Sequence, residues 1–155
     1  LLHIISESAP FIPNISKLSE RIGINRHTLL AYLHYLHEAK LIICLYRDAH
    51  GISALQKPDK LYLENTNLMY LLKNVQPDIG TIRETFLANQ LSYEHELEYS
   101  EVGDFLVDGQ YTIEVSGKNK TRAQIKTASD AYFAADNLEY GNDRKIPLWM
   151  FGFLY

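Results

Sequence analysis

Two stretches near the start of the chain place apolar side chains at helical spacing. The apolar residues of 15–22 lie three and four positions apart, which predicts a helix that ends at Gly23. Asn25 is a favourable cap for a second helix, whose leucines repeat at helical spacing over 29–41. Two helices joined by a short glycine-containing turn predict a helix-turn-helix.

The segments after these helices have the character of strands. An apolar run over 41–46 is followed by the polar stretch 47–51 and then by 60–63. Cys44 lies inside the first run, so we interpret it as a small buried apolar residue rather than a nucleophile. Helix, turn, helix and β-hairpin together predict a winged helix over residues 1–65.

A β-hairpin is the clearest prediction in the second half. Residues 104–107 and 111–115 alternate between apolar and polar around Asp108-Gly109, a pair typical of tight turns. A three-residue loop over 108–110, with a positive φ at Gly109 or its neighbour, sorts the two faces better than a two-residue loop. It pairs Phe105 with Ile113 and Asp104 with Glu114.

Other segments complete a mixed α+β arrangement. We expect a helix over 81–91, a weak strand over 91–99, a helix over 121–132 that lies on the sheet, and a strand beginning at 133–135. The apolar stretch 147–154 is either a buried last strand or a docking surface. Residues 66–155 then form a mixed sheet flanked by helices.

Composition and charge narrow the possible functions. The chain has 155 residues, 46% of them hydrophobic, which suits one domain or two small ones. Residues 1–65 hold seven Lys/Arg and six Asp/Glu, whereas residues 66–155 hold eight and thirteen. Neither half has the basic excess typical of tight, sequence-independent DNA binding. We find no apolar run long enough for a membrane span and no signal peptide, and one cysteine favours a reducing, cytoplasmic setting.

The second helix is a candidate reading element for the major groove of DNA. The exposed positions expected on it and on the wing are Arg26, His27, Thr28, Ala31, His34, Tyr35, Lys57 and Lys60. The alternative is a winged helix that serves as a packing or protein-contact module, since two histidines and a near-zero charge suit DNA poorly.

Three carboxylates form a candidate metal site. Glu84 lies near the apolar face of the helix 81–91, and the favoured hairpin register sets Asp104 opposite Glu114. Three such oxygen ligands would suit Mg²⁺ or Mn²⁺. The alternative is a solvated sheet edge with unrelated acids.

A basic cluster follows the hairpin. It consists of Lys118, Lys120, Arg122 and Lys126. It is either a phosphate-binding group near the carboxylates or a solvated helix end.

The order of these features resembles a known family. A helix bearing Glu84, a strand with Gly103-Asp104-Phe105, then Ile113-Glu114-Val115 and a helix with Gln124 is similar to the PD-(D/E)XK nuclease-like fold. With the preceding winged helix, the chain resembles the C-terminal region of a family of bacterial and archaeal AAA+-type ATPases. Further stretches that carry the likeness are 15–24, 32–36, 57–62, 84–91 and 146–155.

The resemblance implies roles for individual residues. Glu84, Asp104 and Glu114 would each ligate a divalent ion, and a lysine two residues after Glu114 would orient the attacking water. Ser116 occupies that position and has no positive charge. Lys118, two residues further on and followed by Lys120, is the candidate cation that could reach back from a loop. We therefore expect a nuclease-like scaffold with incomplete chemistry.

The resemblance also implies partners. It places a P-loop ATPase module before the winged helix, but the sequence contains no Gly-x-x-x-x-Gly-Lys-Ser/Thr motif. ATP would therefore bind to a preceding portion, and the chain is expected to be a piece of a longer protein. The leading hypothesis is an accessory region that recognises nucleic acid or a protein partner. The alternatives are an active metal-dependent nuclease and a DNA-binding transcription regulator.

Overall fold

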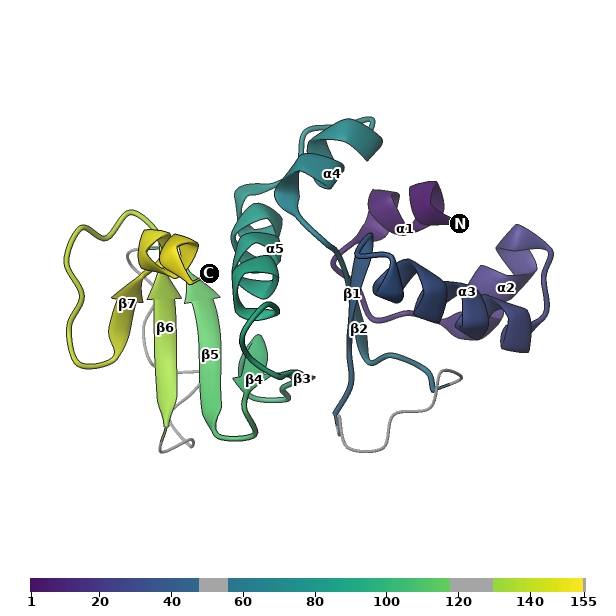
Figure 1. Ribbon diagram of the computed structural model, residues 1–155. Coiled ribbons are helices and arrows are strands. Elements are labelled where there is room, and N and C mark those ends of the chain that lie inside the picture. Colours follow the sequence, from purple (N-terminus) through teal and green to yellow (C-terminus); the bar gives the residue numbers. More distant parts are fainter. Residues whose placement is uncertain (48–55, 118–129, 155) are drawn as a thin grey trace. The chain divides into compact units, whose positions relative to one another are not determined.

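The computed structural model describes residues 1–47, 56–117 and 130–154, and it has a mixed α+β fold (Figure 1). The chain divides into two compact units, Leu1–Pro77 and Asp78–Tyr155. The division falls later than the expected boundary after residue 65. The reason is that helix α4 (Thr66–Leu72) packs against helix α1 (Leu2–Ser8) and strand β2 (Lys60–Leu63), and so belongs to the first unit.

The two helices expected in the first unit are present. Helix α2 spans Ile15–Ile22 and helix α3 spans Arg26–Glu38. Gly23 ends α2 in the left-handed region at φ 75°, a conformation that glycine adopts without steric cost. Asn25 caps α3 through its side-chain oxygen, which accepts a hydrogen bond from the Thr28 backbone N–H at 2.9 Å. Both predicted helix ends are therefore confirmed.

Strands β1 (Ile42–Leu45) and β2 form an antiparallel pair in the first unit. A third segment joins them, because Phe11 and Leu61 exchange two backbone hydrogen bonds, at 3.1 and 2.9 Å. Buried apolar side chains from the helices and strands form the core of this unit. They include Ile5, Leu29, Leu33, Ile42, Leu61 and Met69. Cys44 is buried among them, as predicted, and burial raises the pKa of its thiol to about 12.

The second unit begins with helix α5 and ends with a short 3₁₀ helix. Its elements are α5 (Ile79–Leu91), β3 (Leu97–Tyr99), β4 (Phe105–Val107), β5 (Tyr111–Ser116), β6 (Ala131–Ala135), β7 (Lys145–Pro147) and the 3₁₀ helix η1 (Leu148–Phe153). The sheet order is β3-β4-β5-β6-β7. Strands β3, β4 and β5 are antiparallel, whereas β5, β6 and β7 are parallel neighbours.

The β4–β5 hairpin has the predicted three-residue loop. Phe105 pairs with Ile113 and Val107 with Tyr111. Asp108 and Gly109 adopt positive φ values of 52° and 65°. The alternation of side chains thus identified the correct register.

Three expectations for the second unit need correction. The weak strand expected over 91–99 is confined to Leu97–Tyr99, because 92–94 form a turn after α5. Most of the expected helix 121–132 lies outside the described residues, but Tyr132 lies in strand β6, where it pairs with Ile113. The stretch 147–154 is mainly η1 rather than a buried strand, and it exposes Trp149, Met150 and Phe153 while burying Leu148 and Phe151.

Helix α5 and η1 cover one face of the five-stranded sheet. Phe86 of α5 lies beside Gly152 of η1, and Leu91 lines the same pocket as Ile113. Because successive side chains of a strand point to opposite faces, Glu114 points away from α5. None of the helices in the described ranges has the length and apolar character needed to cross a lipid bilayer.

Candidate functional site

A polar cavity of about 410 Å³ opens at the start of helix α2. Three segments of the first unit form it: the residues leading into α2, the first residue of α3, and the segment before β2. The lining residues are Ile12, Pro13, Asn14, Ile15, Ser16, Arg26 and Lys57. Two of the predicted nucleic-acid contacts, Arg26 and Lys57, therefore line one cavity although they lie far apart in the sequence.

Capping interactions fix the two helix ends that face this cavity. The Asn14 side chain accepts a hydrogen bond from the Lys17 N–H at 3.1 Å and begins α2. The Asn25 cap makes Arg26 the first residue of α3. A helix N-terminus carries a partial positive charge from its unpaired backbone N–H groups. The cavity thus combines two cationic side chains with a helix end that favours anions.

The two cations in the cavity differ from other cations of the same unit. Arg21 forms an ion pair with Glu7 at 3.1 Å, and Arg47 forms one with Asp59 at 3.2 Å. Within the ranges that the structure describes, neither Arg26 nor Lys57 has a hydrogen bond or an ion pair through its side chain.

The remaining predicted contacts have other surroundings. His27 is exposed, Thr28 and His34 are half-buried, and the His34 ring lies 6.0 Å from that of Tyr35. The Lys60 ammonium lies 5.0 Å from the centre of the Tyr62 ring. None of these four lines the polar cavity. Lys118, Lys120 and Arg122 lie outside the described residues.

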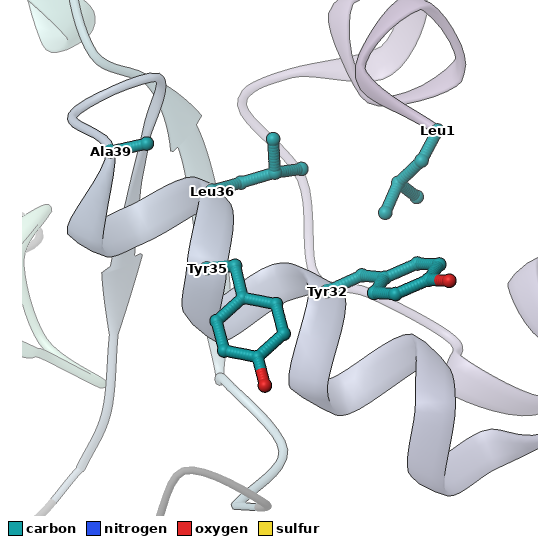
Figure 2. Close-up of a pocket in the computed structure, with 5 residues that line it drawn as sticks. All are labelled: Leu1, Tyr32, Tyr35, Leu36 and Ala39. Carbon is teal, nitrogen blue, oxygen red and sulfur yellow. The ribbon is translucent and has the colours of Figure 1, made fainter.

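A second hollow in the first unit is apolar. It has a volume of about 390 Å³ and is lined by Leu1, Tyr32, Tyr35, Leu36 and Ala39. Figure 2 shows Leu1 extending from the start of α1 toward the Tyr32 ring of α3. Tyr35, which was predicted to be exposed, is 63% exposed. Tyr32 was not predicted as a surface residue, although its spacing of three from Tyr35 is a helical one.

Asp104 makes a specific contact with the neighbouring strand. Its Oδ2 accepts a hydrogen bond from the Val115 backbone N–H at 2.7 Å, and its own N–H donates to the Ile113 carbonyl at 3.0 Å. The regular pairing of β4 with β5 stops at Phe105. The Asp104 carboxylate therefore accepts the Val115 N–H where a backbone carbonyl of a longer β4 strand would otherwise accept it.

The other two predicted metal ligands lie on different elements. Glu84 is half-buried on α5, and Glu114 is buried on the sheet face that points away from that helix. Across residues 1–47, 56–117 and 130–154, no group of three or more His, Cys, Asp or Glu side chains is placed to hold a metal ion. The metal site at Glu84, Asp104 and Glu114 stays a prediction.

Ser116 occupies the place of the lysine that the nuclease resemblance implies. Its hydroxyl is buried and has no hydrogen-bond partner in the described structure. A neutral hydroxyl provides no positive charge for an attacking water. Lys118, the alternative cation, falls outside the described residues.

An ion pair that no sequence pattern predicts joins α5 to the end of β6. The Arg83 Nε lies 2.8 Å from the Asp136 carboxylate, and the Arg83 guanidinium also lies close to Gly117. The two residues are 53 positions apart. No sequence spacing predicts this contact. Helix α5 packs on β5, and the parallel pairing of β5 with β6 brings the end of β6, and with it Asp136, near that helix.

Comparison with protein-family models, with curated proteins and with solved structures finds no match to this chain.

Proposed function

We propose that this chain is an accessory region that recognises nucleic acid, with the first unit contacting the phosphate backbone of a duplex. The observation that carries the proposal is the polar cavity, in which Arg26 and Lys57 meet the N-terminal end of α2. Phosphate oxygens accept hydrogen bonds from cationic side chains and from the backbone N–H groups of a helix N-terminus.

The order of elements in the first unit supports a winged helix. Helix α1, the short pairing of Phe11 with Leu61, the helix pair α2 and α3, and the antiparallel strands β1 and β2 follow one another. In a winged helix the second helix of the pair faces the major groove. Arg26 at the start of α3 and Lys57 before β2 would then contact phosphates beside that groove.

The charge balance favours modest, salt-dependent binding. Residues 1–65 carry a formal charge of +1, from seven Lys/Arg and six Asp/Glu. Two phosphate contacts release few counterions, so binding is expected at low salt and is lost as salt rises. This behaviour suits a module that positions a larger protein on its target.

For the second unit we propose a nuclease-like scaffold without hydrolytic activity. A helix followed by three antiparallel strands supports the scaffold, with Glu114 on β5 and Asp104 directly before β4. Ser116 at the lysine position and the hydrogen bond of Asp104 to the Val115 N–H support the loss of activity. ATP hydrolysis would belong to a separate P-loop module that acts together with this chain.

Titration of a short fluorescent duplex with the full chain at low salt tests the proposal. We expect Arg26→Ala and Lys57→Ala each to weaken binding and to reduce the slope of log affinity against log salt by about one unit. Arg144→Ala is the matched control, because it removes an exposed arginine of the second unit. Absence of binding at low salt, or equal effects of all three variants, would contradict the proposal.

The same duplex incubated with Mg²⁺ or Mn²⁺ distinguishes the two nuclease hypotheses. We expect no cleavage by the wild-type chain. Metal-dependent cleavage that disappears in Glu114→Ala would instead establish an active nuclease.

A protein partner is the second candidate, and the apolar hollow on α3 favours it. Tyr32 and Tyr35 are exposed aromatic side chains beside Leu36, a combination that is common at protein interfaces (Figure 2). Tyr35→Ala should leave duplex affinity unchanged if this hollow serves a protein. If Tyr35→Ala weakens duplex binding as much as Arg26→Ala does, the apolar hollow contacts DNA as well.

A further inference from the structure

The second unit contains a pocket that none of the proposed functions uses. It has a volume of about 290 Å³ and lies between the end of α5, the sheet and η1. Leu91, Ile113 and Phe151 form apolar walls from these three elements, and the Tyr132 ring adds an aromatic one. We name it the aromatic pocket. Its volume suits a molecule built on a single ring.

One polar pair lies among these apolar walls. The His95 Nδ1 lies 2.7 Å from the Asp108 carboxylate, and both residues line the aromatic pocket. Asp108 is itself fixed by Glu96, the residue before β3: its other oxygen accepts the Glu96 N–H at 2.9 Å, and its own N–H donates to the Glu96 carbonyl at 2.9 Å. The loop conformation at φ 52° thus holds the carboxylate against the imidazole.

This contact determines which nitrogen of His95 can meet a ligand. The hydrogen bonds from His95 and Glu96 keep the pKa of Asp108 below its usual range, so the carboxylate is ionised and can only accept. Nδ1 must therefore be the donor, and in the neutral imidazole Nε2 carries the lone pair. When the imidazole is uncharged, Nε2 is therefore the one hydrogen-bond acceptor that His95 contributes to the lining of the apolar pocket.

We infer that the aromatic pocket is a binding site for a small, uncharged single-ring compound with one hydroxyl donor, of the phenol or aromatic-alcohol class. The ring would contact Leu91, Ile113 and Phe151, and the hydroxyl would donate to His95 Nε2. The negative charge of Asp108 disfavours ring carboxylates. This site is independent of the polar cavity, which lies in the first unit.

Two matched ligands test the inference on the wild-type full chain. Anisole has the ring and oxygen of phenol but lacks the hydroxyl hydrogen. In two-dimensional ¹H–¹⁵N spectra we expect phenol to shift the amide signals of residues around the pocket with saturation in the millimolar range. We expect anisole to bind about fivefold more weakly, as the loss of one hydrogen bond predicts.

A histidine variant separates ligand binding from structural support. In His95→Asn the amide nitrogen can still donate to Asp108, but Nε2 is removed. We expect this variant to bind phenol and anisole equally, while His27→Asn, a change at an exposed histidine, keeps the preference of the wild type. The inference is overturned if phenol leaves the pocket signals unshifted, if anisole binds the wild type as well as phenol, or if a folded His95→Asn keeps the preference. If His95→Asn fails to fold, the comparison of phenol with anisole on the wild-type chain still tests the role of the hydroxyl group.

Discussion

At the scale of single residues, Glu64 is the most unusual side chain in the first unit. It follows strand β2 directly and is only 3% exposed, and its Oε1 has no hydrogen-bond partner in the described structure. Burial raises the pKa of its carboxyl, while the nearby charges of Lys40 and His37 partly oppose the rise. The buried environment of Glu64 therefore favours the protonated, neutral form of its carboxyl group.

We expect Glu64→Gln to stabilise the chain at neutral pH, because the amide avoids the cost of burying a charged carboxylate. Because the pKa of Glu64 is higher in the fold than in the unfolded chain, the wild type loses stability as pH rises above the ordinary value of 4.5. The glutamine variant does not titrate, so its advantage should shrink as pH falls toward that value. Urea denaturation at several pH values measures this difference.

The control for this prediction is Glu38→Gln, which neutralises an exposed glutamate at the end of α3. At neutral pH it should change the free energy of unfolding less than Glu64→Gln does. An advantage of Glu64→Gln that is constant across pH would contradict the role assigned to its charge.

Some residue-level features could be predicted from the sequence, whereas Glu64 could not. The Asn25 cap, the Gly23 helix end and the burial of Cys44 follow from local preference and from neighbours in the chain. The burial of Glu64 depends on the packing around β2, which no local pattern records. A buried carboxylate opposes the ordinary preference of glutamate for solvent.

At the scale of elements, the turn before β4 depends on close approach of two backbone segments. A Cβ built on Gly103 would lie 2.8 Å from the Thr112 Cγ2 and 3.0 Å from the Ile113 carbonyl oxygen. The backbone oxygen cannot move without disturbing β5. We therefore expect Gly103→Ala to lower the free energy of unfolding by about 1–3 kcal/mol, measured by chemical denaturation.

Gly152→Ala is the matched control for Gly103→Ala. Its Cβ would meet only the tip of the Phe86 ring at 3.5 Å, an ordinary contact distance. A small effect at position 152 beside a large one at 103 is the expected result. Equal and small effects would show that the approach of Gly103 to β5 is looser than the structure indicates.

The elements differ in how well the sequence predicted them. The β4–β5 hairpin was predicted with its register. Only one pairing of the two strands places most apolar side chains on one face of the sheet and most polar ones on the other. The apolar stretch that contains η1 has no helical or strand period, so its half-exposed 3₁₀ conformation was missed. Its partners on α5 are distant in sequence, and only the folded sheet places them nearby.

At the scale of the whole molecule, the chain has two compact units that divide after Pro77, whereas we expected a boundary after residue 65. Residues 66–72 fall on the far side of the expected boundary, yet they form α4, whose Met69 is buried in the core of the first unit with Ile5 of α1. The candidate site shows the same limit. Arg26 and Lys57 were each predicted as nucleic-acid contacts, but their position at one cavity at the start of α2 depends on tertiary packing.

Each unit has its own set of buried apolar residues, so residues 1–77 should fold without the rest of the chain. We expect this fragment to unfold cooperatively in urea and to bind the duplex with the same Arg26 dependence as the full chain. Circular dichroism follows the fragment, while the single tryptophan, Trp149, reports on the second unit in the full chain. An unfolded 1–77 fragment would contradict the prediction, as would a folded fragment that binds the duplex only when residues 78–155 are present. In the second case the phosphate contacts of the polar cavity would be insufficient for recognition, because the acidic second unit would have to contribute binding energy of its own.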